Sequence, residues 1–250
     1  MKRKKIIAAN WKMYKTVQES RAFIDAFLPL VKQHDRDEIV ICPSFVNIAA
    51  VLEQTRGSQI KVGAQNVYWE KEGAFTGEVS PGMLAGAGCE FVIVGHSERR
   101  QYFGETDDTV NRRLESALEA GLATILCVGE VLEEREAKLT EDVLRRQCSR
   151  AFSGISARKA SKLNIAYEPV WAIGTGKTAT PQMAADAHAV IRQEAALIFG
   201  KEFAAGLRIL YGGSVKPDNA QALMTESEID GALVGGASLN PESFAAIVKY

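Results

Sequence analysis

The sequence predicts a single α/β domain built from parallel strands that are buried on both faces. Eight short apolar runs, rich in Ile and Val, recur along the chain, and a helix-length segment follows each one. The runs lack the polar alternation of a strand with one face in water, as is typical of parallel strands covered by helices. The chain has 250 residues and no break in composition, so we expect one domain over residues 1–250.

Each apolar run is bounded by Gly, Pro, Asn or Glu and is taken as a strand. In chain order the predicted strands are Ile6–Asn10, Ile39–Cys42, Val62–Gln65, Phe91–Gly95, Thr124–Val128, Leu163–Tyr167, Leu207–Tyr211 and Ala232–Val234. Eight alternations of strand and helix can close a (β/α)8 barrel or form a doubly wound sheet. The alternation alone does not decide between the two.

The segments between the strands carry helix signals. Apolar residues of Asp107–Ala120 recur on one helical face. Ser80-Pro81 and Thr180-Pro181 each place an N-cap residue before a proline at the first helical position. Pro29 lies inside the first helical pattern, so we expect that helix to kink or end there. Asn66–Val79 has neither pattern, and a loop this long in a compact domain is usually functional.

Charge and cysteine content exclude several classes of protein. Lys plus Arg number 30 and Asp plus Glu 31, so the net charge of -1 gives no general attraction to nucleic acid or anionic lipid. No run approaches the roughly 18 apolar residues of a membrane span, and the brief apolar start does not fit a signal peptide. The four cysteines show no CxxC spacing and lie in apolar contexts. We expect reduced, mostly buried thiols in a cytoplasmic protein.

Polar and glycine-rich segments gather where the predicted strands end. In parallel α/β folds the carboxyl ends of strands meet at one face, where reactive groups collect. Here those ends read Asn10-Trp11-Lys12, Gly95-His96-Ser97-Glu98, Glu168-Pro169, Gly212-Gly213-Ser214 and Gly235-Gly236. A Lys, a His and a Glu from different strands, beside two glycine-rich loops that offer backbone N–H groups, indicate acid–base chemistry on a small phosphorylated molecule.

Some of these residues also fit other interpretations. Gly174–Thr178 resembles the end of a P-loop, but Trp171 stands where the first glycine is required. None of the three histidines has a partner at metal-ligand spacing, which disfavours metal-dependent hydrolysis. Asn10 fits a turn cap as well as a substrate ligand, Arg99 fits a structural ion pair, and Cys127 and Glu130 fit structural roles.

Five of these segments together carry a family resemblance. In order and in spacing, from end to end of the chain, they resemble the triosephosphate isomerase family: Ala9–Met13, Gly95–Arg100, Ala166–Lys177, Tyr211–Val215 and Leu233–Leu239. The resemblance implies a (β/α)8 barrel and an obligate dimer. It also implies interconversion of dihydroxyacetone phosphate and D-glyceraldehyde 3-phosphate through an enediolate, in glycolysis and gluconeogenesis, without metal or cofactor.

The resemblance also implies a role for each site residue. Glu168 is the base, His96 the electrophile on the substrate carbonyl, and Lys12 the cation beside the developing enediolate. Asn10 orients the substrate oxygens, and Glu98 pairs with Lys12. Phosphate is held by the N–H groups of four further residues, which are Gly174, Ser214, Gly235 and Gly236.

The resemblance assigns two segments to closure and assembly. Residues 169–179 form a lid that includes Trp171 and Ile173, with Ile173 and Leu233 expected to flank Glu168 when the lid closes. Residues 65–78 carry the apolar tip Gly73–Gly77 and are expected to insert into a partner subunit near Lys12 and His96.

Two rival functions belong to other classes. A barrel epimerase acting on a phosphorylated sugar would share the phosphate site, but would lack the joint Lys12, His96 and Glu168 set and often carries metal ligands. A catalytically dead barrel that serves as a binding scaffold would have lost at least one reactive residue, and none is missing from this sequence.

Overall fold

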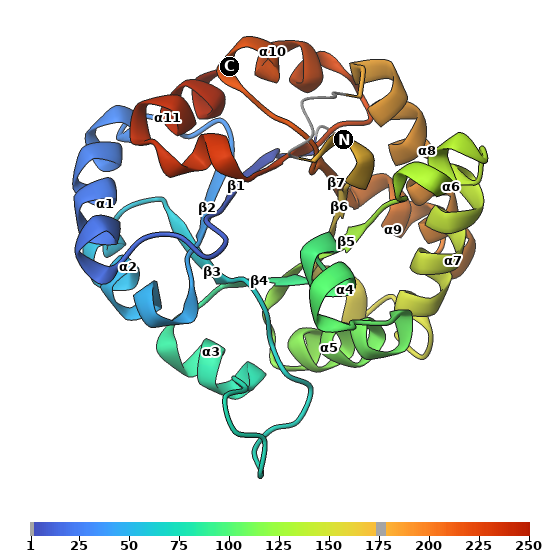
Figure 1. Cartoon of the computed structure of the whole chain (residues 1–250), viewed down its shortest axis with the longest axis horizontal. Helices are drawn as coiled ribbons and strands as arrows, with labels where there is room; N and C mark the ends of the chain where they lie inside the picture. Colours follow the sequence, from blue (N-terminus) through green and yellow to red (C-terminus); the bar gives the residue numbers. More distant parts are fainter. Residues whose placement is uncertain (1–2, 174–178) are drawn as a thin grey trace.

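Eight parallel strands close into a barrel within residues 3–173 and 179–250, which are the residues described by this computed structural model (Figure 1). The barrel settles the alternative that the sequence left open, because a doubly wound sheet does not close. Each strand begins and ends within one residue of its predicted run. The strands are β1 (Ile6–Asn10), β2 (Glu38–Cys42), β3 (Lys61–Ala64), β4 (Phe91–Val94), β5 (Ala123–Val128), β6 (Leu163–Tyr167), β7 (Arg208–Tyr211) and β8 (Gly231–Val234).

Alternate residues of the strands face two separate cores. Ile6 pairs with Glu38 of β2 on one side and with Gly231 of β8 on the other, which closes the ring. Ile6 and Ala8 join the core inside the barrel, whereas Ile7 and Ala9 join the core beneath the helices. Both sides of each strand are therefore apolar, because successive side chains point to opposite faces.

Helices surround the barrel (Figure 1). They are α1 (Val17–Val31), α2 (Ile48–Thr55), α3 (Pro81–Ala87), α4 (Ser97–Phe103), α5 (Asp107–Glu119), α6 (Leu132–Glu136), α7 (Thr140–Phe152), α8 (Pro181–Phe199), α9 (Lys201–Gly206), α10 (Pro217–Thr225) and α11 (Pro241–Lys249). Short 3-10 helices are η1 (Phe45–Asn47), η2 (Lys159–Lys162), η3 (Val170–Ala172) and η4 (Gly236–Leu239). In the described ranges no helix is both long and apolar enough to cross a bilayer.

The helix ends agree with the capping residues and the proline predicted from the sequence. The hydroxyls of Ser80 and Thr180 accept hydrogen bonds from the backbone N–H groups three residues on, which confirms both N-caps. Helix α1 continues past Pro29 and ends two residues later, at Val31. The helix therefore ends close to the proline, as predicted. All four cysteines are free and buried, as predicted.

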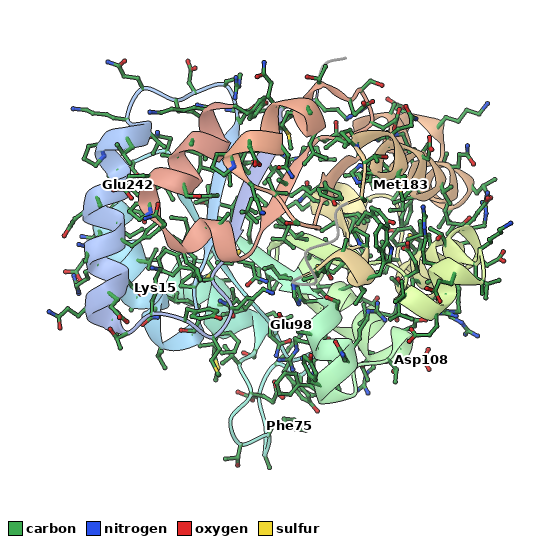
Figure 2. All side chains as sticks on the ribbon, turned by 45° about the horizontal axis from the view of Figure 1, so that its top comes forward. Lys15, Phe75, Glu98, Asp108, Met183 and Glu242 are labelled. Atoms are coloured by element: carbon green, nitrogen blue, oxygen red, sulfur yellow. The ribbon has the colours of Figure 1, made fainter. Side chains whose placement is uncertain are left out.

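The predicted long loop projects from the barrel between β3 and α3 (Figures 1 and 2). Residues 66–79 contain neither helix nor strand. The Tyr68 ring stacks on Trp69 at 4.1 Å and contacts Phe75 at 4.8 Å between ring centroids. Phe75, labelled near the tip in Figure 2, remains 41% exposed. The loop thus packs against itself yet leaves an aromatic ring in solvent.

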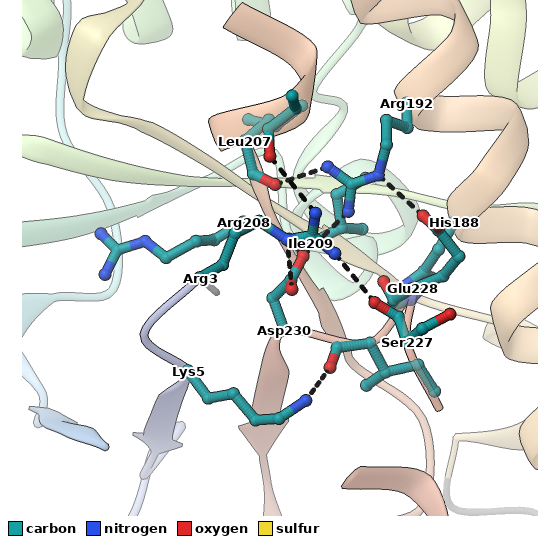
Figure 3. Close-up of polar contacts among 12 residues, drawn as sticks. Arg3, Lys5, His188, Arg192, Leu207, Arg208, Ile209, Ser227, Glu228 and Asp230 are labelled. Atoms are coloured by element: carbon teal, nitrogen blue, oxygen red, sulfur yellow. Dashed lines mark hydrogen bonds and ion pairs between the residues drawn. The ribbon is translucent and has the colours of Figure 1, made fainter. Parts of the chain in front are cut away.

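The amino ends of the strands, opposite the site, carry a buried ionic network (Figure 3). Asp230 precedes β8 and accepts hydrogen bonds from Arg3 Nε at 2.6 Å, Arg192 Nη2 at 2.9 Å and the Ile209 N–H at 3.0 Å. Arg192 also pairs with Glu228 at 2.7 Å. The buried Asp230 carboxylate, with its three donors, holds α8, β7 and β8 to the segment that precedes β1.

His188 of α8 lies beside this network and is fully buried. Its Nδ1 is 3.0 Å from the Glu228 carbonyl oxygen, which can only accept, so Nδ1 carries the proton. The Tyr167 ring meets the imidazole edge-on at 5.9 Å. Burial lowers the pKa of His188 to about 4. The folded protein therefore holds this histidine neutral at pH values where the unfolded chain, with a pKa near about 6.5, is protonated.

Stability should accordingly fall as the pH drops from about 6.5 to about 4, since the unfolded state binds the extra proton. The difference corresponds to about 3 kcal/mol at the acidic end of this window. We expect His188→Asn, whose amide can donate to the same carbonyl, to remove this part of the acid sensitivity. Urea unfolding of parent and variant between pH 7 and 4.5 measures it. Equal slopes of unfolding free energy against pH would contradict the assignment.

Candidate active site

The carboxyl ends of the strands open into one cavity of about 490 Å³. Its walls come from the segments after β1, β4, β6, β7 and β8. Most of the predicted site residues line it, namely Asn10, Lys12, His96, Glu168, Ile173, Ser214, Gly235 and Gly236. Glu98 and Trp171 lie just outside it, and Gly174 falls outside the described residues. The predicted residues at the strand ends therefore share one cavity.

Glu168 and His96 meet in the wall of the cavity. Glu168 follows β6 and is 2% exposed, and His96 follows β4 and is 6% exposed. His96 Nε2 lies 2.9 Å from Glu168 Oε1, and the Ser97 N–H donates to Oε2 at 2.8 Å. The carboxylate is thus held by the Ser97 N–H and by the close approach of the His96 ring, both from the segment that begins α4.

The backbone of α4 fixes the tautomer of His96. His96 is the N-cap of α4, and its Nδ1 accepts a hydrogen bond from the Glu98 N–H at 3.3 Å. An accepting Nδ1 leaves the proton on Nε2, which points at Glu168. In its neutral form the imidazole therefore presents its Nε2–H to Glu168.

The two buried groups shift one another's pKa. Burial lowers the pKa of His96, but the carboxylates of Glu168 and Glu98 together outweigh burial and raise that pKa above its ordinary value. Burial raises the pKa of Glu168, but His96 and the Ser97 N–H together hold that pKa below its ordinary value. In the absence of substrate the carboxylate is stabilised as an anion, so a ligand that takes over the His96 donor would increase its basicity.

Lys12 adds a cation to the same cavity. Its backbone is left-handed, with a φ of 52°, and hydrogen bonds hold both its N–H and its carbonyl. Asn10 Oδ1 accepts the Lys12 N–H at 3.0 Å, and Gln65 Nε2 donates to the Lys12 carbonyl at 2.9 Å. Lys12 Nζ lies 2.5 Å from Glu98 Oε1, so the predicted ion pair is present. Asn10 does cap the turn, and this role leaves it lining the cavity.

The structure gives Arg99 a partner that the sequence did not indicate. Arg99 pairs with Glu105, which is buried and also pairs with Arg113 at 3.2 Å. Glu98, its neighbour in sequence, points instead toward Lys12. Adjacent residues at the start of a helix face different directions, so sequence proximity does not identify the ion pair.

The loops after β7 and β8 form the opposite end of the cavity. Ser214 lies in the first loop, and the Asn219 amide donates to its carbonyl at 3.0 Å. Gly235 and Gly236 lie in the second loop, where η4 begins, and the Ser238 N–H and hydroxyl both bind the Gly235 carbonyl. Lys216, which sequence reasoning did not single out, also lines the cavity. Backbone N–H groups beside a lysine are suited to an oxyanion.

The segment after Glu168 is anchored by Glu130, which follows β5. Glu130 is fully buried and accepts hydrogen bonds from Trp171 Nε1 at 2.8 Å and from Tyr167 Oη at 3.1 Å. Its carbonyl accepts the Val170 N–H at 3.0 Å. The preceding Gly129 has no room for a side chain, because a Cβ would lie 1.7 Å from the Glu168 carbonyl oxygen. Sequence reasoning took Glu130 as structural and missed its contact with the predicted lid, although its place at a strand end is a usable signal.

Ile173 and Glu168 also border a second cavity, of about 590 Å³, behind the first. Trp171 lines this second cavity, and Leu233 lines the first. Ile173 thus borders both spaces, as Glu168 does.

Comparison with known proteins gives one consistent answer. A family model described as triosephosphate isomerase matches residues 5–250. The triosephosphate isomerase of Solibacter usitatus (strain Ellin6076) is 59% identical over 248 residues, covering 99% of this chain and 100% of the relative. That of Geobacter metallireducens is 54% identical, and that of Clostridium botulinum (strain ATCC 19397 / Type A) is 53% identical, each over 98% of both chains.

Proposed function

Because this chain belongs to the triosephosphate isomerase family, we propose that Glu168, His96 and Lys12 perform the family's reaction in one catalytic domain over residues 1–250. The enzyme interconverts dihydroxyacetone phosphate and D-glyceraldehyde 3-phosphate in glycolysis and gluconeogenesis. The observation that carries the residue assignment is the 2.9 Å approach of Glu168 to His96 Nε2, in a cavity that Lys12 also lines.

The reaction begins when the substrate carbonyl oxygen replaces Glu168 as acceptor of the His96 Nε2 proton. The freed carboxylate, still buried, becomes a stronger base and removes the proton from C1. The C1–H electron pair forms the C1–C2 double bond, and the carbonyl electron pair moves to oxygen. Lys12 and His96 stabilise that oxyanion in a site of low dielectric.

Completion of the cycle needs no net proton change. His96 passes a proton between the two enediolate oxygens, and Glu168 returns its proton to C2. Asn10 orients the oxygens, and Glu98 holds the Lys12 ammonium group at 2.5 Å. The N–H groups of Ser214, Gly235 and Gly236, together with Gly174, bind the phosphate.

A coupled assay in both directions tests the proposed function. We expect the purified protein to interconvert the two triose phosphates at the same rate with and without a chelator. Loss of turnover on chelation would favour the metal-dependent epimerase class. Absence of turnover would favour a binding scaffold.

We further propose that Ile173 belongs to a lid that shields Glu168 from water. Its place in the lining of the same cavity as Glu168 and Leu233 supports this role. The enediolate can expel its phosphate when water and conformational freedom are admitted. Ile173→Ala should lower turnover and raise the phosphate and methylglyoxal released per isomerisation by at least about threefold.

Measurement of both products per turnover distinguishes this role from simple packing. Ile198→Ala, a change at a 40% exposed position on α8, is the matched control and should leave the ratio at the parental value. An unchanged ratio in Ile173→Ala would remove Ile173 from the lid.

The protein assembles as a homodimer through the long loop after β3. Large apolar side chains are exposed on one side of the barrel mouth, among them Met13 at 93%, Val46 at 77% and Phe103 at 67%. A cavity of about 260 Å³ beside Met13, Phe45 and Phe103 reaches Lys12 and His96. It is suited to the apolar tip of a partner's loop, whose Phe75 ring stays 41% exposed despite its contact with Tyr68.

We expect the parent to sediment as a dimer at micromolar concentration. Phe75→Asp should sediment as a monomer with at least about tenfold lower activity, because burying a charge in this apolar cavity is costly. Leu197→Asp, at a 75% exposed position on α8, is the control and should stay dimeric. A fully active parental monomer at that concentration would refute the assembly.

The cytoplasm is the proposed location. Free thiols at Cys42, Cys89, Cys127 and Cys148, all buried, support a reducing compartment.

A further inference from the structure

Lys15 stands in an unfavourable backbone conformation close to the site. Its φ is 70°, which lies in the left-handed region. Glycine adopts this region freely, but other residues rarely do. Lys12, three residues earlier, is also left-handed. Strain of this kind persists only where surrounding contacts determine the conformation, and it is concentrated at functional sites.

The side chain of Lys15 makes three contacts that account for this conformation. Its Nζ donates to the Leu239 carbonyl at 2.8 Å. The ammonium group also lies 4.8 Å from the centroid of the Phe23 ring and 5.4 Å from that of Trp11. Both rings are buried, so a cation over their faces is attracted to them in a partly desolvated setting. Figure 2 shows Lys15 beside α1.

The main chain of Lys15 is held as well. Its carbonyl accepts a hydrogen bond from the Asn47 amide at 2.7 Å, and Asn47 is fully buried where η1 ends. Lys15 thereby joins three segments that follow β1, β2 and β8. Its position is determined from both backbone and side chain.

The segments after β1 and β8 contain complementary parts of the site. The first holds Lys12, and the second holds Gly235, Gly236 and, at its end, Leu239. They meet inside the site, where a Cβ on Gly235 would lie 3.2 Å from Lys12 Cε. The bond from Lys15 to Leu239 joins them a second time, outside the cavity.

We propose that Lys15 is a positioning residue that fixes the Lys12 segment relative to the Gly235–Leu239 segment, an inference that rests on the functions proposed for those segments. Through this contact the Lys12 ammonium group stays at a fixed distance from the N–H groups of Gly235 and Gly236. Lys15 does not line the cavity, so it acts only through the groups that do.

Three substitutions separate positioning from simple stabilisation. Lys15→Met keeps the aliphatic stem and removes the cation and donor. Lys15→Arg keeps both. Lys15→Gly removes the side chain and also the backbone strain, so its melting temperature should be at least that of Lys15→Met. For each variant, kcat, KM, the inhibition constant of inorganic phosphate, the melting temperature and the sedimentation coefficient are measured.

We expect Lys15→Met and Lys15→Gly to lower kcat/KM by about tenfold and to weaken inhibition by inorganic phosphate by at least about threefold, because small displacements in a site have large kinetic costs. Lys15→Arg should recover most of both losses. Parental kcat/KM and phosphate inhibition in Lys15→Gly would overturn the proposal, even if Lys15→Met folds poorly.

A parallel measurement on Lys12→Met distinguishes an error in the positioning role of Lys15 from an error in the role proposed for Lys12. If Lys12→Met loses activity while Lys15→Met and Lys15→Gly match the parent, the positioning role is wrong and the site assignment stands. If Lys12→Met itself matches the parent, the proposed role of Lys12 is wrong, and the positioning role is wrong with it.

Discussion

Replacing Glu168 with glutamine should lower kcat by about 10²–10⁴-fold while inhibition by inorganic phosphate stays within about a few-fold of the parental value. Glutamine keeps the size of the side chain and can still accept a hydrogen bond from the Ser97 N–H, which now donates to Glu168 at 2.8 Å. It cannot accept a proton from carbon at neutral pH. The loss should therefore fall on the chemical step and spare the phosphate site.

Steady-state kinetics with both triose phosphates provides the measurement. Glu242→Gln, an exposed change in the first turn of α11, is the matched control and should behave as the parent. Turnover of Glu168→Gln within a few-fold of the parent would mean that another group removes the proton.

The second large effect is expected at Lys12. Lys12→Met keeps the stem that lies against Gly235 but removes the charge beside the developing oxyanion. Loss of one preorganised electrostatic contact of this kind should lower kcat/KM by about 10²–10³-fold. Glu98, which is 37% exposed, can remain solvated after losing its partner, so folding should be retained.

Lys216→Met is the natural comparison, because Lys216 lines the same cavity at its phosphate end. Its loss should raise KM, with less effect on kcat than that of Lys12. Circular dichroism of both variants confirms that the fold is kept. A loss for Lys12→Met no greater than that for Lys216→Met would contradict the role given to its charge.

The strands and the face that carries the site could be predicted because their signals are local. Parallel strands buried on both faces leave uninterrupted apolar runs such as Leu163–Tyr167, and each observed strand lies within one residue of its run. Reading only the residues that follow these runs identified His96 and Glu168, which the closed barrel brings within 2.9 Å.

Contacts between different loops could not be predicted in the same way. The anchoring of Trp171 by Glu130 and the bond from Lys15 to Leu239 both depend on packing between segments. Lys15 and Leu239 are 224 residues apart and meet only because β1 pairs with β8. Local sequence patterns do not predict such neighbours, because the residues are close together only in the closed barrel.

Hydrogen exchange at the substrate's carbon tests the central claim, that Glu168 transfers a proton between C1 and C2. Dihydroxyacetone phosphate is incubated in D2O with the parent or with Glu168→Gln, and carbon-bound deuterium is followed by NMR. We expect the parent to form product and to incorporate deuterium, and Glu168→Gln to lose both together. Exchange by Glu168→Gln at the parental rate would contradict the assignment of Glu168 as the base.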